Sequence, residues 1–141
     1  NFKPVNDRFG HALGDNVLRE LAALLRSESR AGDLGARLGG DEFGLWLEDT
    51  DAAGAAIKAQ HLLDALPHLR SAVGLPFDAA REPVGFSIGV AIVDPQIPET
   101  LEQTMSRADA AMYQVKHAGK GGLWLAPAAS SANPATEPAP C

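Results

Sequence analysis

The stretch RLGGDEFGLW, residues 37–46, constrains the fold most, because two glycines and two carboxylates interrupt two short apolar runs. Short apolar runs separated by a glycine-containing break are typical of a β-hairpin. We therefore expect residues 34–38 and 43–48 to be the two strands of a hairpin. A hairpin turn needs the glycines, but it does not need adjacent acids whose charges repel each other. Asp41 and Glu42 therefore indicate a role for this turn beyond reversing the chain.

Helical and extended patterns alternate along the rest of the domain. Apolar residues at helical spacing predict three helices, and apolar residues alternating with small ones predict further strands. The order helix, hairpin, helix, strand, helix, strand predicts an α/β (α+β) layer in which helices cover a mixed sheet. The first expected helix runs from a cap at Asp15 to Ser29, the second follows residues 49–51, and the third runs from residues 98–100 to Lys116. The other expected strands are residues 84–93 and 122–126. Residues 70–83 are expected to be a surface connection. The third helix is expected to bury Leu101, Met105, Ala108, Met112 and Val115.

Length and composition favour one domain with a disordered tail. The chain has 141 residues and a formal net charge of −6, and its last part is rich in Ala, Pro and Ser. We expect a domain over residues 1–125 and a tail over 126–141. The acidic balance argues against nucleic-acid binding, which needs a basic face. The single cysteine, Cys141, excludes a disulfide framework, and we expect a reducing, cytoplasmic location.

The acidic turn has the chemistry of a metal and phosphate site. Two adjacent carboxylates on a sharp bend share one space only when a cation neutralises them, and oxygen ligands select Mg²⁺ (or Mn²⁺). Glycines allow a backbone to approach a phosphate closely, because no Cβ intervenes. These features suit a nucleoside triphosphate whose charge is balanced by a divalent ion. The alternative is an inert turn with two solvated acids.

Four separated stretches resemble, in order and spacing, the motifs of the GGDEF domain of diguanylate cyclases. They are FKPVNDRFGHALGDNVL (2–18), RLGGDEF (37–43), FSIGVA (86–91) and RADAAMYQVKHAGK (107–120). The similarity covers residues 2 to about 125. It implies a palm-like nucleotidyl cyclase fold, with a central mixed sheet flanked by helices.

The resemblance implies that two GTP condense to cyclic di-GMP and two pyrophosphates, with one GTP held by each protomer of a homodimer. Asp41 and Glu42 match the metal-binding acids, and Asp41 also matches a residue that assists removal of the hydroxyl proton. Gly39 and Gly40 match the backbone that contacts the phosphates. Arg37 is expected to be structural, in an ion pair beside the turn.

Other matching positions bind the substrate. Asn6 and Asp15 match the pair that recognises guanine, whose N1–H and N2–H₂ donors suit a carboxylate. The alternatives are a turn residue for Asn6 and a helix cap for Asp15. Lys3, Lys116 and Lys120 match cationic positions near the triphosphate. Lys120 stands where an arginine is common, which keeps the charge but loses the bidentate fork, and a solvated lysine is its alternative.

The segment RAGD, residues 30–33, matches the RxxD motif of a product-inhibition site that binds cyclic di-GMP. Arg30 and Asp33 stand at the motif's register to the GGDEF turn, and a local surface ion pair is the alternative. Members of the family often complete this site with an arginine from the helix after the hairpin. Residues 60–62 contain no arginine, so the second half of the site is expected to be altered.

The family pattern begins earlier than this sequence, with a strand that normally lies in the middle of the sheet and ends in D-x-D. We therefore expect an N-terminally truncated fragment, inactive and marginally stable by itself, from a protein with an upstream sensory domain and the option of a membrane anchor there. Two other functions stay open. One is an inactive GGDEF module that binds GTP or cyclic di-GMP and regulates a partner; the other is a different palm-like nucleotidyl transferase. The intact turn favours the enzyme.

Overall fold

The computed structural model describes residues 3–75 and 85–129, with the side chains described from Val5 onward. Of the expected tail, residues 130–141 lie outside the described residues. The same holds for residues 76–84, which include most of the expected surface connection and the start of one expected strand.

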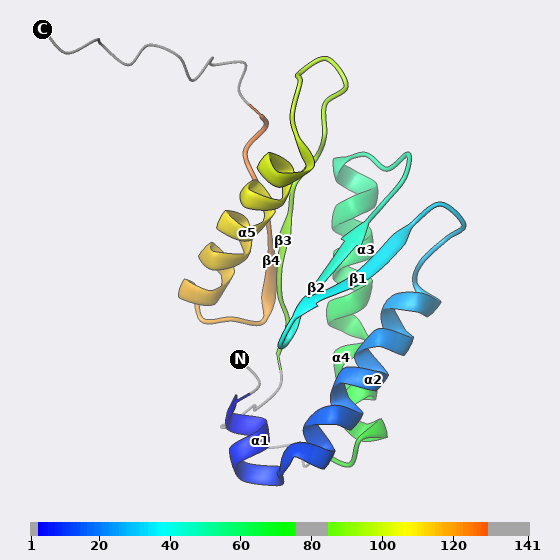
Figure 1. Ribbon diagram of the computed structural model, residues 1–141, viewed down its shortest axis with the longest axis vertical. Helices are drawn as coiled ribbons and strands as arrows, with labels where there is room; N and C mark the ends of the chain where they lie inside the picture. Colours follow the sequence, from blue (N-terminus) through cyan, green and yellow to red (C-terminus); the bar gives the residue numbers. More distant parts are fainter. Residues whose placement is uncertain (1–2, 76–84, 130–141) are drawn as a thin grey trace, which may run out of the picture.

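The described elements follow the expected order, with two further short helices (Figure 1). The predicted hairpin is present, and each predicted helix has a counterpart. The additions are a helix at the start of the chain and a helix that occupies the first part of the expected connection. The elements are α1 (Lys3–Phe9), α2 (His11–Ser27), β1 (Leu34–Gly39), β2 (Glu42–Trp46), α3 (Ala52–Asp64), α4 (Leu66–Ala72), β3 (Ser87–Val90), α5 (Leu101–His117) and β4 (Gly122–Leu125).

The strands form two separate pairs within the described residues. β1 and β2 are antiparallel, with Leu34 opposite Trp46 and an irregularity just before the turn. β3 and β4 are parallel, with Ser87 opposite Gly122. Parallel and antiparallel pairing are therefore both present, as expected of a mixed sheet, but no ladder joins β2 to β3 in the described part of the chain.

The start of α2 differs from the prediction. The helix begins at His11, directly after Gly10, whose φ of 84° is a left-handed conformation that favours glycine. The first helix, α1, ends at Phe9, and Gly10 N donates to the carbonyl of Asn6 in its last turn. Asp15 therefore lies inside α2 and is exposed, and the prediction that it caps the helix was wrong.

The starts of α3 and α5 agree with the sequence signals. Asp51 accepts a hydrogen bond from Gly54 N at 2.8 Å and caps α3. Thr100 and Gln103 form a capping box at the start of α5, each side chain accepting from the other residue's main chain. Such caps satisfy main-chain donors that have no partner within the helix.

The buried face of α5 is only partly the predicted one. Leu101 and Met105 are 61% and 43% exposed, so their predicted burial was wrong. The helix packs closest to the sheet at Gly89, where a Cβ would fall on the carbonyl oxygen of Ala108 and 2.5 Å from Met112 N. Contact with β3 and β4 therefore lies farther along the helix, beyond its first turns.

Arg107 fixes α5 to three neighbouring segments. Its guanidinium donates to the Glu99 carboxylate at 2.6 and 2.7 Å, and to the carbonyls of Ile92 and Pro127. These hydrogen bonds lower the pKa of Glu99 and raise that of Arg107. The far end of α5 carries Lys116, one of the expected triphosphate lysines, and Lys120 follows in the turn after the helix.

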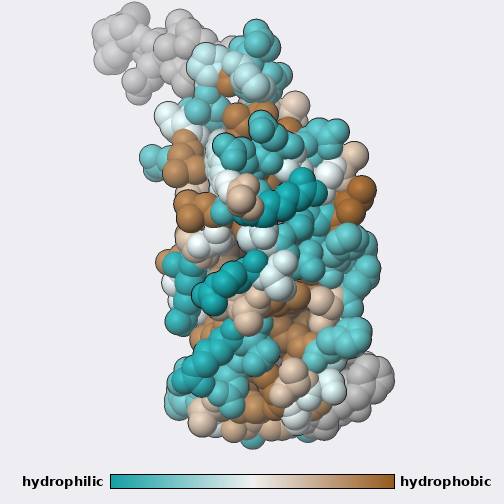
Figure 2. Space-filling model, turned by 90° about the vertical axis from the view of Figure 1, so that its right-hand side faces the viewer, coloured by the Kyte–Doolittle hydropathy of each residue, from teal (hydrophilic) through white to brown (hydrophobic). Residues whose placement is uncertain are grey.

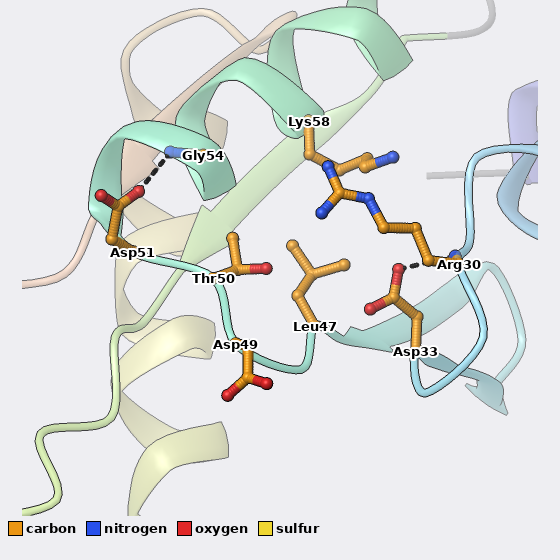
Figure 3. Close-up of a pocket in the computed structure, with 8 residues that line it drawn as sticks. All are labelled: Arg30, Asp33, Leu47, Asp49, Thr50, Asp51, Gly54 and Lys58. Atoms are coloured by element: carbon orange, nitrogen blue, oxygen red, sulfur yellow. Dashed lines mark hydrogen bonds between the residues drawn. The ribbon is translucent and has the colours of Figure 1, made fainter.

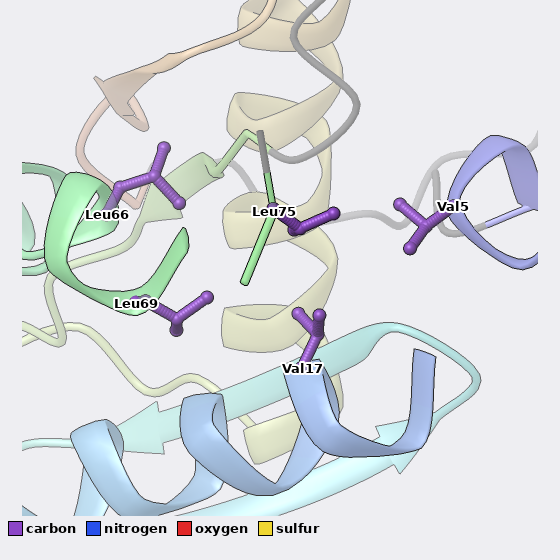
Figure 4. Close-up of a cluster of buried hydrophobic side chains, with 5 residues drawn as sticks. All are labelled: Val5, Val17, Leu66, Leu69 and Leu75. Atoms are coloured by element: carbon purple, nitrogen blue, oxygen red, sulfur yellow. The ribbon is translucent and has the colours of Figure 1, made fainter. Parts of the chain in front are cut away.

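A helical core lies where α1, α2 and α4 meet (Figure 4). Its buried members are Val5, Val17, Leu66, Leu69 and Leu75. On the face drawn in Figure 2, apolar side chains show as separate patches among hydrophilic ones. Among the described residues, none of the helices has the length and apolar character that crossing a membrane requires.

Candidate functional site

Most of the elements that carry the expected substrate residues lie in the lower half of Figure 1. These are α1, the beginning of α2, the turn between β1 and β2, and the end of α5 with the segment leading to β4. The segment between α2 and β1, which carries residues 30–33, lies in the upper half. We call the first region the glycine-turn end, after the turn at residues 39–42. We call residues 30–33 the RAGD loop, and the cavity beside it, described below, the RAGD cleft.

The turn between β1 and β2 depends on glycine for its backbone. Gly40 has a φ of 50°, and Gly39 has a φ of 156°. No atom lies within 4 Å of the Cβ that either glycine would carry, so there is open space beside both. Arg37 donates from Nε and Nη2 to the carbonyl of Gly40, at 3.0 and 2.8 Å, and so fixes the turn. Arg37 thus contacts the turn through a main-chain carbonyl, while the ion pair expected for it stays a prediction.

Asp41 lies in the turn and Glu42 is the first residue of β2; both are exposed. The two residues are adjacent in sequence and directly follow the two glycines. Within residues 3–75 and 85–129, no cluster of three or more His, Cys, Asp or Glu side chains is arranged to hold a metal ion. A metal held at this turn therefore takes further ligands from substrate, water or segments beyond the described ones.

Asn6, on α1, has a buried side-chain oxygen, Oδ1, with no hydrogen-bond partner among the described residues. Buried polar atoms almost always have a partner, so an orphaned acceptor indicates a ligand or a water molecule that donates to it. Asp15 is exposed in the first turns of α2, the helix that directly follows α1. The sequence alone identified both residues, but it did not indicate that Asn6 has an unmet acceptor.

Lys116 and Lys120 are exposed at the end of α5 and just after it. Lys120 has a φ of 67°, between Gly119 and Gly121, which also have positive φ. Its main-chain N–H donates to the carbonyl of Val115 at 3.0 Å, which holds this turn against the helix. A non-glycine residue in this conformation is a strained feature of the kind found at ligand sites. The side chain of Lys3 lies outside the described part of the chain.

Asp33 joins two loops at the RAGD cleft. Its carboxylate accepts from Arg30 N at 2.8 Å and from Glu48 N at 3.2 Å, on the far side of the hairpin. These hydrogen bonds lower the pKa of Asp33, the one from Arg30 most, against a smaller opposing effect of burial. Gly32 has a φ of 103°, and a Cβ there would meet the carboxylate of Glu48. The RAGD loop is therefore held by a hydrogen bond within it and by a second one to Glu48.

The cleft beside this loop has a volume of about 360 Å³ (Figure 3). It is bounded by the RAGD loop, the loop after β2 and the first turns of α3. Its lining residues are Arg30, Asp33, Leu47, Asp49, Thr50, Asp51, Gly54 and Lys58. Arg30 and Asp33 therefore line one cleft, in which Asp33 bonds to the main chain of Arg30 and the Arg30 side chain borders the cavity.

Lys58 is the residue of this cleft that the sequence did not single out. The resemblance implies an arginine near residues 60–62, whereas the cation of this helix that lines the cleft is Lys58, two residues before residue 60. Its Nζ donates to the main-chain carbonyl of Glu28 and lies 3.5 Å from the Glu28 carboxylate. The sequence signal, a lysine in the first half of the helix after the hairpin, was present.

The chain resembles known proteins over most of its length. Residues 1–122 match the family model "Diguanylate cyclase, GGDEF domain". The chain is 41% identical over 120 residues to the probable diguanylate cyclase DgcE of Escherichia coli. The matched region covers 85% of this chain and 10% of that protein. It spans about a tenth to a third of the length of the first curated relatives that it matches.

Solved structures show the same fold. The GGDEF domain of PA1120 (YfiN or TpbB) from Pseudomonas aeruginosa matches with a TM-score of 0.73 and 34% identity, over 90% of this chain and 76% of that one. The active GGEEF domain of a diguanylate cyclase from Vibrio cholerae matches with a TM-score of 0.75 and 29% identity, over 92% and 78%. The predicted fold class is thus confirmed, and the chain belongs to the GGDEF domain family of diguanylate cyclases.

Proposed function

We propose that this domain, within its full protein and as a homodimer, condenses two GTP to cyclic di-GMP and two pyrophosphates. The observation that carries the proposal is the intact turn of Gly39, Gly40, Asp41 and Glu42, with open space beside both glycines and two exposed acids. Degenerate members of the family usually lose the acids or glycines of this turn. The intact turn therefore favours the cyclase over an inactive module that binds nucleotides and regulates a partner.

Asp41 and Glu42 would hold a divalent cation, and the donor chemistry at the turn fits one. Both donors are carboxylates, which suit Mg²⁺ or Mn²⁺, and the open space beside Gly39 and Gly40 leaves room for phosphate oxygens to complete the coordination. When bound, the metal supplies charge neutralisation at the reacting phosphate. The two main-chain positions would contact the phosphates, because no side chain intervenes there.

In the proposed reaction, the 3′-oxygen of one GTP bonds to the α-phosphorus of the other, and the bond from that phosphorus to the pyrophosphate oxygen breaks. Asp41 would accept the proton of the attacking hydroxyl. Two such transfers, one from each protomer, close the ring and release two pyrophosphates. Most of the rate enhancement in such chemistry comes from positioning and charge stabilisation.

Asn6 and Asp15 would select guanine. The unpartnered Oδ1 of Asn6 is an acceptor that a base N–H can satisfy. The Asp15 carboxylate would accept from guanine N1–H and N2–H₂, donors that adenine does not present in that arrangement. Lys116 and Lys120, and Lys3 from α1, would neutralise the triphosphate.

The RAGD cleft would bind cyclic di-GMP and inhibit the enzyme, with Arg30 and Asp33 in contact with the product. Support comes from the cleft that both residues line and from the fixed conformation of the loop. The GGDEF domain of DgcB from Caulobacter crescentus, which is 30% identical to this chain, has been solved in complex with cyclic di-GMP.

Turnover of GTP tests the proposed activity. The full protein is incubated with GTP and Mg²⁺, and the products are separated chromatographically. Cyclic di-GMP is the expected product. Binding of cyclic di-GMP without any turnover would establish the inactive module instead, and a different nucleotide product would establish another palm-like nucleotidyl transferase.

A further inference from the structure

Helix α5 is attached to β3 and β4 at two neighbouring points. At the first, Gly89 of β3 lies so close to the helix that a Cβ would fall on the carbonyl oxygen of Ala108. At the second, the side chain of Arg107, the residue before Ala108, makes hydrogen bonds to three segments around the helix. Figure 1 shows α5 lying along both strands. Both points are in the first half of the helix, and its C-terminal turns lie beyond them.

The guanidinium of Arg107 joins two segments that each follow a strand. Its Nη2 donates to the carbonyl of Ile92 at 2.7 Å, and its Nη1 donates to that of Pro127 at 3.0 Å. Ile92 lies two residues after the end of β3, and Pro127 lies two residues after the end of β4. The parallel pairing of these strands continues as far as the hydrogen bond from Ala126 N to the Val90 carbonyl. Arg107 therefore connects the two strands just past their ladder and ties both to α5.

Stability alone does not account for the charged pair of Arg107 and Glu99. The two side chains are 19% and 6% exposed, so both charges are largely removed from water. Taking two charges out of water costs free energy, and well-packed apolar side chains often stabilise such a position equally well. Apolar side chains cannot form directed bonds to fixed acceptors, whereas the planar guanidinium forms four here. The pair therefore sets the placement of α5 as well as holding it.

We propose that Arg107 is a positioning residue for the substrate, which sets where Lys116 and Lys120 meet the triphosphate by fixing α5 on β3 and β4. The inference rests on the proposed function, which assigns both lysines to GTP. Lys116 follows Arg107 on the same helix, about 14 Å farther along its axis at ~1.5 Å per residue. The main-chain N–H of Lys120 bonds to the carbonyl of Val115, so this turn moves with the helix. A tilt of about 5° at Arg107 would displace Lys116 by about 1 Å, enough to weaken a contact with a phosphate.

Steady-state kinetics of the full protein with GTP test the inference through a paired substitution. Arg107→Met alone leaves the Glu99 carboxylate largely buried and unpaired, so it should lower the melting temperature as well as raise KM. The pair Glu99→Leu/Arg107→Met removes both charges and should recover most of the melting temperature. Its KM for GTP should stay about fivefold above the wild-type value, while kcat changes by less than about twofold, because the lysines contact the triphosphate before and during the reaction.

Further variants separate position from stability. Arg107→Lys keeps a charge beside Glu99 without the planar set of donors, and should show a smaller rise in KM. Ala59→Gly places a glycine inside α3, so it should lower the melting temperature and leave KM unchanged. In a Lys116→Ala/Lys120→Ala background, the paired substitution should raise KM by less than about twofold, since the effects of residues that act through one another are not additive.

The outcomes distinguish a failure of this inference from a failure of the proposed function. A wild-type KM in both the paired variant and Arg107→Lys would overturn the positioning role and leave the cyclase in place. A rise in KM of equal size with and without the two lysines would also overturn it, because Arg107 would then act through other groups. If the wild type forms no cyclic di-GMP, or the chain without both lysines keeps the wild-type KM, the proposed function or its lysine contacts fail, and this inference fails with them. Circular dichroism checks that each variant is folded, and Arg107→Lys decides the question if the paired variant is not.

Discussion

The glycine-turn end and the RAGD cleft use their charged residues in different ways. At the turn, the described contacts fix the backbone, through Arg37 and the carbonyl of Gly40, and Asp41 and Glu42 are exposed. At the cleft, Asp33 is bonded to the main chain of two loops. The described contacts therefore hold the backbone of the turn, whose two acids are the proposed metal ligands, whereas at the cleft they hold an acidic side chain itself.

The largest expected effect is on turnover at the turn. Asp41→Asn should lower the rate of cyclic di-GMP formation by at least about a thousandfold, because it removes a charge from the proposed metal site and the proton acceptor. Its melting temperature should stay near that of the wild type, since Asp41 is exposed. The rate is measured by chromatography of the full protein. Glu20→Gln, an exposed acid on α2, is the matched control, and substantial turnover by Asp41→Asn would remove Asp41 from the mechanism.

Paired glycine substitutions test whether the cleft is the more rigid region. Gly32→Ala introduces a Cβ against Glu48 at a φ of 103°, and should cost about 2–3 kcal/mol of unfolding free energy. Gly40→Ala adds a Cβ in open space at a φ of 50°, and should cost about 1 kcal/mol. Urea unfolding compares the two variants. An equal or larger loss in Gly40→Ala would contradict the contrast between the regions.

Arg30→Ala should weaken product inhibition at the cleft. The concentration of cyclic di-GMP that halves the initial rate should rise at least about tenfold, because a charged contact with a phosphate is lost. Initial rates at several product concentrations measure it. Arg26→Ala, an exposed arginine that does not line the cleft, is the control. Unchanged inhibition in Arg30→Ala would contradict the proposed product site and leave residues 30–33 with a structural role.

The smallest expected effect concerns the charge of Asp33. Its pKa is lowered in the folded chain, so its ionised form contributes stability above the unfolded pKa near 3.8, and this is lost as the pH falls through the lower folded pKa. The wild type should therefore be more stable than Asp33→Asn at neutral pH, and the two should converge in acid. Urea midpoints at several pH values measure the difference. A difference that persists unchanged below the folded pKa would show that charge is not the cause.

Local signals predicted much of the fold. The hairpin followed from glycines between apolar runs, and the starts of α3 and α5 followed from Asp51 and Thr100, which cap their own helices. The start of α2 could not be predicted in this way, because Asp15 has the side chain of a cap while the backbone of Gly10 ends the preceding helix. One residue's conformation outweighed a side-chain preference.

Features that depend on packing between distant segments could not be predicted from the sequence. The exposure of Leu101 and Met105 follows from where Gly89 brings the sheet against α5, which helical periodicity does not contain. Lys58 lines the cleft because three segments border one cavity, an arrangement that no local sequence pattern contains. The orphaned oxygen of Asn6 likewise depends on its surroundings. The sequence was sufficient to name the candidate residues, but not to predict which atoms contact them.

The 17 residues of α2, about 25 Å at 1.5 Å per residue, extend between the two proposed ligand sites. Asp15 lies near one end, and the residue that receives the Lys58 ammonium directly follows the other. A shift of this helix on binding at the RAGD cleft would move the proposed guanine contact at its beginning. Thermodynamic reciprocity then requires that GTP, by occupying its own pocket, expel the cyclic dinucleotide to the same degree that the dinucleotide expels GTP.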